Sequence, residues 1–463
     1  MADNTSPETG RAREPGRPPF PGKAAVFGWI LFDWASQPYF TLVTTFVFAP
    51  YFAASVAETP VEGQALWGYA AAAAGLVVAL LSPVLGAVAD AGGRRKRWLL
   101  SFSAMLVAGC AALWFAVPGS SLAVPLALGG FMLAGVGAEF AIVFTNAMMP
   151  DLVPRTRLGR LSGQSWAVGY AGGLVSLVLV LGFLAASPQT GRTLLGILPA
   201  FGLDPGEGAR VSGPLSALWY AVFVLPLFLF VPDRPLRTHL RDAIATGLGR
   251  LTATLSDARA HHDTIMFLAA NMAYKDGLVA LFAFGGIYAA GTLGWGTIEI
   301  GLFGILLTVT GTLGALIGGW LDDRLGPKPV LVGALAMLIV CSMAIVSIGS
   351  DSILFFIPVA QQTGAPLFST LPEIAYLVFG GVIGACAGPL QSASRTMMIR
   401  VSPPDRITEF FGLFALSGKA TSFIGPLAVA ALTTYAQSQR VGISVIVVLL
   451  AIGMVLLARV KAA

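Results

Sequence analysis

The chain has 463 residues, of which 56% are hydrophobic and 11% are charged, and its net charge is +5. Soluble proteins average about 25% charged residues, and a soluble fold could not bury this much apolar surface. The composition therefore excludes a soluble globular protein. It predicts an all-α polytopic membrane protein, whose apolar runs of about 20 residues cross the hydrocarbon core as helices.

Residues 1–23 are polar and rich in Pro and Arg, and they lack the apolar core and the cleavage site of a signal peptide. We expect them to form a disordered cytoplasmic tail. Apolar runs follow, and their even number puts both termini on one side of the membrane. The twelve predicted spans are Ala24–Ala57, Gln64–Ala89, Trp98–Val117, Leu122–Met149, Leu161–Ala186, Pro214–Val231, Thr264–Ala290, Thr297–Leu321, Val330–Gly349, Leu371–Met398, Ile407–Tyr435 and Val441–Ala458.

The basic residues indicate which side that is. Of the 28 Lys and Arg, Lys275 and Lys419 lie within spans and three others lie on the loops opposite the termini, which leaves 23 on the side of the termini. The positive-inside rule then makes both termini and the central loop cytoplasmic. We expect an integral protein of a bacterial inner (plasma) membrane, whose basic residues contact lipid headgroups and no nucleic acid.

The segment 232–263 separates the sixth and seventh spans, and its apolar residues recur every three or four positions with arginines between them. This period predicts a linker with an amphipathic helix along the cytoplasmic membrane surface. The periodic residues are Leu240, Ile244, Leu248, Leu251 and Leu255. The outer loop Ser187–Gly213 is rich in Gly and Pro and is expected to be irregular.

Two internal repeats divide the chain into a first half, 24–231, and a second half, 264–463. One repeat ends the second and eighth spans at an offset of 233 residues, where Gly86, Asp90, Gly93 and Arg95 match Gly319, Asp323, Gly326 and Lys328. The other opens the fifth and eleventh spans at an offset of 249, where Pro154, Arg157, Leu158, Leu161 and Gly163 match Pro403, Arg406, Ile407, Phe410 and Gly412. Each repeat occupies an equivalent place in its half.

The repeated G-x-x-x-D-x-x-G frame resembles the signature loop of the major facilitator superfamily, which lies between helices 2 and 3 and again between helices 8 and 9. Within that superfamily, Phe32–Ser36, Tyr274–Gly277 and Ser417–Phe423 resemble the vacuole-effluxer family, whose fungal members are associated with amino-acid efflux. The resemblance implies a monomer of two pseudo-symmetric six-helix halves with a substrate site between them near the bilayer midplane.

Several charges fall deep within the predicted spans. Lys275 lies about 16 Å into the seventh span and Lys419 about 18 Å into the eleventh, too deep for their stems to reach the headgroups. Glu139 lies about 15 Å from the inner end of the fourth span. Because each unpaired charge at such depth costs about 2.5–3.5 kcal/mol, we expect these groups and Asp276 to face a central substrate and proton cavity. Structural ion pairing is the alternative.

The same cavity is expected to have a polar lining of Asn146, Gln164, Asn271 and Gln391, with hydrogen bonding between helices as the alternative role. Asp33 has two open assignments, because Pro38 and Pro50 can each kink the first span. It is either a cavity carboxylate or a residue of the inner gate.

The resemblance also implies a gate on the cytoplasmic side. Asp90 is expected to meet the positive end of the eleventh helix near Thr408, and Asp323 the start of the fifth helix near Leu161. Charged neighbours on the same loops complete the expected gate: Arg94, Arg95, Lys328, Arg157 and Arg406. The alternative is that each aspartate only caps its own loop.

These patterns predict a secondary active transporter that moves a small polar solute, such as an amino acid, by alternating access coupled to protons. A membrane sensor or scaffold is the alternative. An intramembrane enzyme is less well supported, because His239, His261 and His262 all lie in the central loop, which removes a serine–histidine dyad. No Walker sequence is present, so ATP is not expected to be the energy source. No cofactor or metal is expected, since the three cysteines lie far apart within apolar runs.

Overall fold

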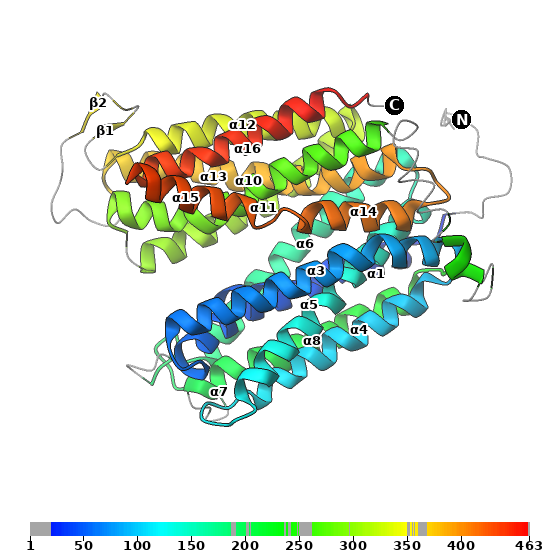
Figure 1. The fold of residues 1–463 in the computed structure, drawn as a ribbon, viewed down its shortest axis with the longest axis horizontal. Coiled ribbons are helices and arrows are strands. Elements are labelled where there is room, and N and C mark those ends of the chain that lie inside the picture. The colour runs from blue at the N-terminus through cyan, green and yellow to red at the C-terminus, as the bar shows by residue number, and fades with distance from the viewer. Residues whose placement is uncertain are drawn as a thin grey trace, which may run out of the picture.

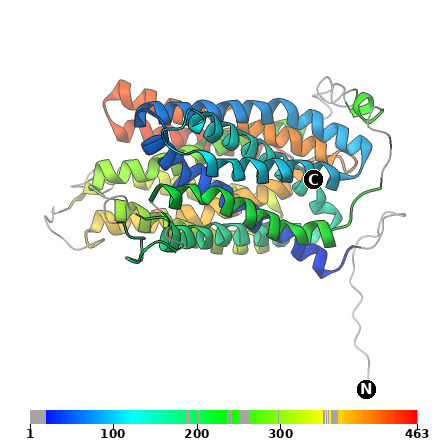
Figure 2. The same ribbon diagram turned by 90° about the horizontal axis from the view of Figure 1, so that it is seen from below.

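The computed structural model describes residues 20–186, 191–200, 203, 205–235, 238, 242–247, 249, 262–295, 297–349, 352–353, 355, 357–359 and 368–461. Within these residues, twelve helices are long and apolar enough to cross a membrane, which confirms the predicted spans and the all-α class. The helices run along one common direction in two bundles, one for each half of the chain (Figures 1 and 2).

The first bundle holds the residues before the linker. Its first span combines α1 (Lys23–Pro38), the π-helical η1 (Tyr39–Phe46), α2 (Phe48–Tyr51) and the π-helical η2 (Phe52–Val56). The other spans are α3 (Pro60–Gly92), α4 (Arg95–Ala112) with η3 (Leu113–Phe115), α5 (Ala123–Met148) with η4 (Met149–Asp151), α6 (Leu158–Leu179) between η5 (Arg155–Arg157) and η6 (Val180–Leu184), and α8 (Ser212–Phe230). The irregular first span agrees with the expected kinks at Pro38 and Pro50.

The second bundle follows the linker. It consists of α10 (His262–Leu293), α11 (Thr297–Leu325), α12 (Pro327–Ser347), α13 (Leu371–Val401), α14 (Ile407–Lys419), α15 (Ile424–Ala436) and α16 (Gln439–Ala458). A short hairpin of β1 (Ser352–Ile353) and β2 (Ile357–Pro358) lies between α12 and α13. The eleventh span is interrupted at residues 420–423, where the sequence predicted a continuous helix.

The start of α1 and the end of α16 lie at the same end of the molecule (Figure 1). This end, which we call the terminal side, also carries the two signature turns. Gly93 ends α3 with a φ of 75° and Gly326 separates α11 from α12 with a φ of 85°, a left-handed backbone that glycine adopts without strain. The repeated glycines of the sequence therefore mark two equivalent reversals of the chain.

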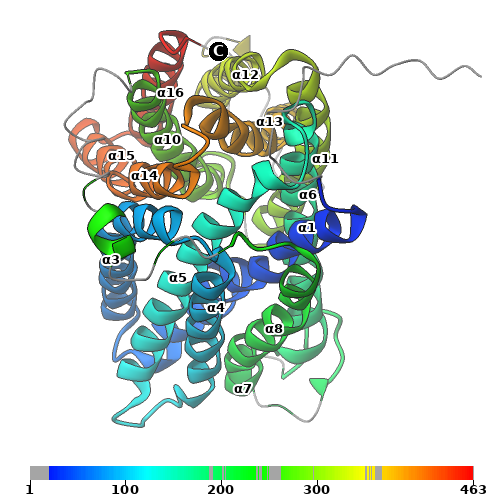
Figure 3. The same cartoon turned by 90° about the vertical axis from the view of Figure 1, so that its right-hand side faces the viewer.

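Glycines also set the contact between the halves. Figure 3 shows α14 beside α3 and α11 beside α6. A Cβ atom added to Gly412 of α14 would touch the backbone of Ser82 in α3, and one added to Gly163 of α6 would touch the backbone of Ala315 in α11. Ser82 and Ala315 are 233 residues apart, and Gly163 and Gly412 are 249 apart, so both repeats map onto one pseudo-symmetric interface.

The outer loop differs from the prediction, and the linker is described only in part. The outer loop, predicted to be irregular, contains the short helix α7 (Pro205–Arg210) and a bridge between Ala186 and Thr193. Residues 242–247 of the predicted amphipathic helix are helical, and Ile244 is exposed. The positions Leu240, Leu248, Leu251 and Leu255, and the tail before Phe20, lie outside the described residues.

The distribution of basic residues makes a topological prediction. Reporter domains fused after Pro118 or within residues 191–200 should be external, and those fused within residues 242–247 should be cytoplasmic, because loops rich in Lys and Arg stay inside. Alkaline phosphatase and green fluorescent protein activities of the same fusions provide opposite readouts. The reverse pattern would contradict the assignment of the terminal side to the cytoplasm.

Candidate functional site

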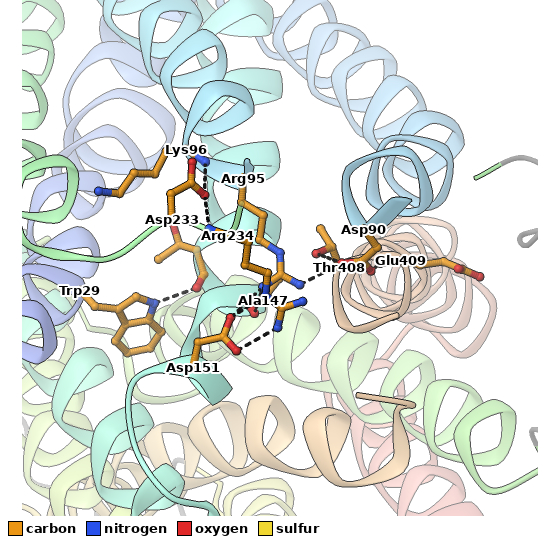
Figure 4. Close-up of polar contacts among 11 residues, drawn as sticks. Trp29, Asp90, Arg95, Lys96, Ala147, Asp151, Asp233, Arg234, Thr408 and Glu409 are labelled. Carbon is orange, nitrogen blue, oxygen red and sulfur yellow. Dashed lines mark hydrogen bonds and ion pairs between the residues drawn. The ribbon is translucent and has the colours of Figure 1, made fainter. Parts of the chain in front are cut away.

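Asp90, near the end of α3, joins the two halves at the terminal side. Its side chain accepts hydrogen bonds from Thr408 Oγ1 at 2.6 Å and from the backbone N–H of Glu409 at 2.9 Å (Figure 4). Both donors belong to the first turn of α14, where unpaired N–H groups favour an anion. The carboxylate is only 4% exposed, so this contact between the halves is shielded from water.

Asp323, near the end of α11, makes the equivalent contact in the other direction. It accepts a hydrogen bond from the backbone N–H of Arg160 at 3.2 Å, and it forms an ion pair with the Arg160 guanidinium at 3.2 Å. Asp90 and Asp323 are 233 residues apart and Arg160 and Glu409 are 249 apart, so the two repeats generate the same contact twice. The second contact is the weaker, because the Arg160 side chain is 52% exposed.

A chain of charges connects Asp90 to the segment that follows α8. Arg95 donates to Asp90 at 2.8 Å, to the Ala147 carbonyl at 2.8 Å and to Asp151 at 3.3 Å (Figure 4). Arg234 binds both oxygens of Asp151 at 2.9 Å. Burial alone disfavours the charged guanidinium, but the hydrogen bonds and charge of Asp151 outweigh it and raise the pKa of Arg234.

The other residues predicted for the gate lie around these contacts. Arg406 pairs with Glu409 at 2.6 Å, and the exposed Arg157 lies near Asp323. Arg94 adopts a left-handed backbone, and its N–H donates to the Arg234 carbonyl. Lys328 donates to the carbonyls of Ala458 and Val460, so it binds the end of α16 in its own half and is directed away from the first half.

Deeper in the molecule, an ion pair links the halves. Lys419 Nζ lies 2.7 Å from Glu139 Oε1, and their side chains are 30% and 21% exposed, respectively. Lys275 is half-buried, its ammonium against Gly418 and 5.8 Å from the centre of the Phe414 ring. The structure therefore pairs Lys419 with Glu139 and places Lys275 within electrostatic reach of both.

The break in the eleventh span creates two helix ends, which stabilise the charges of Lys419 and Asp276. α14 ends at Lys419, and the partial negative charge of a helix C-terminus favours a cation there. Asp276 is 3% exposed and lies beside Thr421, just ahead of the α15 N-terminus, which favours an anion. The two adjacent residues therefore contact different parts of the broken span: Asp276 lies beside Thr421 at the break, and Lys275 lies beside Gly418 in α14.

A second deep ion pair was not predicted. Asp33 Oδ2 in α1 accepts hydrogen bonds from Arg395 Nη2 in α13 at 2.8 Å and from Ser165 Oγ in α6 at 2.7 Å. Arg395 is one of the 23 cations assigned to the side of the termini, but the structure buries it six residues before the end of α13. The signal was present, because Arg395 lay inside the predicted span Leu371–Met398.

The predicted polar lining separates into different environments. Asn271 donates to Ser417 at 2.9 Å within the second half, as the structural alternative proposed. Gln164 is exposed, and Asn146 is buried in α5. Gln391 donates to the Tyr170 hydroxyl at 2.8 Å, a hydrogen bond between the two halves that is also of the kind the structural alternative proposed.

Apart from Asp276, which lies within the second half, the deep charges are segregated by sign between the halves. The first half contributes the carboxylates Asp33 and Glu139, and the second contributes the cations Lys275, Lys419 and Arg395. Opposite charges at this depth draw the halves together and can be neutralised or displaced by a proton or a charged solute. The arrangement suits reversible contact between two rigid bodies.

Comparison with known proteins agrees with this architecture. The family model described as "Vacuole effluxer Atg22 like" matches residues 53–463. The uncharacterized MFS-type transporter YxiO of Bacillus subtilis is 24% identical over 434 residues, which are 93% of each chain. Autophagy-related protein 22 of Coccidioides immitis is 26% identical over 232 residues, which are 47% of this chain and 37% of that protein.

Two solved structures share the fold. FucP, a major facilitator superfamily transporter in the outward conformation, superposes with a TM-score of 0.65 at 14% identity, covering 95% of this chain and 99% of FucP. A bacterial homologue of the iron transporter ferroportin in an outward-facing state superposes with a TM-score of 0.66 at 15% identity, covering 94% of this chain and 98% of the homologue. These relatives are transporters and not enzymes. The chain belongs to the Atg22-like vacuole effluxer family of the major facilitator superfamily.

Proposed function

We propose that the protein is a secondary active transporter that moves a small polar solute by alternating access, with protons as the coupling ion. The observation that carries this proposal is the set of complementary charges that face each other across the two halves beside a broken helix. Discontinuous helices near the midplane form substrate and ion sites in many transporters, because their ends carry partial charges. The two rigid halves then alternate around that site.

The contacts between the halves support an assignment to one state of the cycle. Asp90, Asp323 and the glycine contacts all lie toward the terminal side. We infer that this side is closed and that the site faces the opposite side. The outward states of FucP and of the ferroportin homologue, whose folds are similar, support the same assignment.

We assign solute binding to the cluster around the break in the eleventh span. Lys275 has no carboxylate within ion-pair distance among the described residues, and its ammonium is available to an anionic group. Glu139 and Lys419 would hold the other polar groups of the solute. An amino acid or a similar zwitterion fits this set of charges, and efflux is the direction that the family description suggests.

Proton coupling would use one of the carboxylates at this depth. Asp33, Glu139 and Asp276 are the candidates, since neutralising any of them changes the attraction between neighbouring charges. Two solved structures of similar fold are described as proton symporters, the fucose transporter FucP and the xylose transporter XylE. At sequence identities of 14–15% these structures share the fold with this chain, and neither the coupling ion nor the solute follows from that likeness.

The solute can be identified by comparing metabolites of deletion and overexpressing cells. The solute that accumulates on deletion and falls on overexpression should be transported by purified protein in liposomes. A solute that binds the purified protein and never crosses the liposome membrane would contradict the proposal. That result would favour the alternative of a sensor or scaffold.

A further inference from the structure

The segment that follows α8 returns to the signature turn between α3 and α4. Asp233 Oδ1 accepts a hydrogen bond from the backbone N–H of Lys96 at 3.3 Å, and the Arg234 carbonyl accepts one from the N–H of Arg94 at 3.3 Å. α4 begins without a side-chain cap of its own. Because the first N–H groups of a helix have no partner within that helix, this segment supplies contacts that the turn itself lacks.

The linker also binds the end of α3. Thr238 Oγ1 donates at 3.2 Å to the carbonyl of Ala91, one of the last carbonyls of the helix, which have no partner within it. In the helical residues 242–247, Ala243 is 1% exposed and packs with Val88 and Ala91 in a small apolar cluster. We call these linker residues the strap: Asp233, Arg234, Thr238 and residues 242–247.

A face of small residues brings the strap close to α3. A Cβ atom added to Gly247 would lie 2.8 Å from the backbone nitrogen of Val88, and one added to Gly92 would lie 3.3 Å from the Cβ atom of Ala243. A Cβ atom added to Gly249, two residues further on, would meet nothing within 4 Å. A single methyl group at Gly247 should therefore displace the strap, whereas one at Gly249 should not.

The turn of α3 that binds the strap also carries Asp90. This residue lies between Val88 and Ala91, and its carboxylate binds the first turn of α14 in the opposite half. Gly86, one turn earlier, approaches the backbone of Thr408. One end of α3 thus holds α14 on one face and the strap on another. A partner that orders this end reduces the entropy that the other partner must remove, so each contact favours the other.

The equivalent turn of the second half is secured within its own half. α12 begins with Pro327, which has no N–H to satisfy, and Lys328 donates to the carbonyls of Ala458 and Val460 at the end of α16. The linker therefore supports the contact of Asp90, and the two pseudo-symmetric contacts between the halves are held by different means.

We propose that the strap is a conformational switch, which lies on α3 while the terminal side is closed and leaves α3 when that side opens. Release of the strap loosens the turn that positions Asp90 and so favours opening, and attachment of the strap favours closure. The linker is then more than a tether between the halves. The proposal rests on the alternation between states proposed above, and it requires neither a solute nor a proton.

The first test displaces the strap. After replacement of the three native cysteines, Ser392→Cys, at a position 1% exposed, is labelled with a membrane-impermeant thiol reagent from the terminal side. Gly247→Ala should speed this labelling by at least about fivefold, the lower end of the coupling between linked sites. Gly249→Ala is the matched control, because it brings the same gain in helix propensity without the clash, and it should label as the wild type does.

The second test fixes the strap in place. Gly92→Cys and Ala243→Cys put two sulfur atoms on Cβ positions 3.3 Å apart, close enough for a disulfide. The bond joins the strap to α3 and does not connect the two halves directly. With the disulfide formed, labelling of Ser392→Cys should be at least about fivefold slower than after reduction, as measured by mass spectrometry of the peptide that contains residue 392.

Two results would overturn the proposal. One is equal labelling of Gly247→Ala and the wild type under conditions in which Asp90→Asn is labelled faster. The other is a fully formed disulfide that leaves the labelling rate unchanged, since the strap would then stay on α3 in both states. A terminal side that stays closed in every variant, Asp90→Asn included, would contradict the alternation itself and with it the release of the strap.

Discussion

Replacing Glu139 with Gln is expected to abolish solute transport in liposomes, with a loss of about 100-fold or more. The change leaves Lys419 without its partner at 2.7 Å and removes the carboxylate that lies between the repelling charges of Lys419 and Lys275 in their electrostatic balance. Two like charges close together at low dielectric repel strongly and distort the position of any bound solute. Initial uptake rates at equal amounts of inserted protein provide the measurement, with the exposed Glu58→Gln as the control.

A double variant separates a binding role from a structural one. Glu139→Gln combined with Lys419→Gln removes both charges, so thermal stability lost in the single variant should return. The recovered stability should be less than the roughly 3–5 kcal/mol typical of fully buried pairs, because both side chains are partly exposed. Transport should stay absent. A double variant with restored transport would show that the pair is only structural.

Replacing Asp90 with Asn is expected to open the terminal side. The carboxylate accepts three hydrogen bonds, two of them from α14 of the opposite half. An amide oxygen without charge accepts fewer and weaker bonds, so the closed state should lose about 2 kcal/mol or more, roughly 30-fold in the equilibrium between states. The contact with the Arg95 guanidinium is lost at the same time.

Labelling of a buried cysteine measures this opening. Ser392→Cys lies at the interface, where Ser162 donates to its backbone carbonyl, and it is 1% exposed. A membrane-impermeant thiol reagent applied from the terminal side should label it faster in Asp90→Asn. Asp323→Asn is the matched control and should have a smaller effect, because its contact with Arg160 is longer and more exposed. Equal labelling of wild type and Asp90→Asn would rule out the latch.

The sequence predicted the features that depend on local pattern. Apolar length identified the twelve spans, and the resemblance to the major facilitator superfamily implied the contacts of Asp90 with Thr408 and of Asp323 with the start of α6. The repeats located the four segments involved, and the resemblance supplied the pairing of each loop aspartate with a helix N-terminus of the other half. The helical rise per residue gives the depths of Glu139, Lys275 and Lys419 in the bilayer, which stay predictions.

The remaining features depend on helix rotation and tertiary packing. Depth alone does not show which side chains face each other, so the pair of Asp33 and Arg395 was missed although both residues lay inside predicted spans. The break after Lys419 follows from Pro426, which lacks an N–H and whose ring clashes with the carbonyl four residues earlier, at Ser422. Prolines also occur inside continuous helices, such as Pro83 and Pro389, so the presence of Pro426 alone did not predict a break.

The central claim is that solute movement is coupled to protons through the charges between the halves. Its most direct measurement is the internal pH of liposomes containing the purified protein and a pH-sensitive dye, recorded after addition of the solute identified in cells. The account predicts that solute movement changes the internal pH, that Glu139→Gln abolishes both fluxes, and that a pH gradient alone drives accumulation of the solute. Solute movement without any change in internal pH, at any imposed gradient, would contradict it.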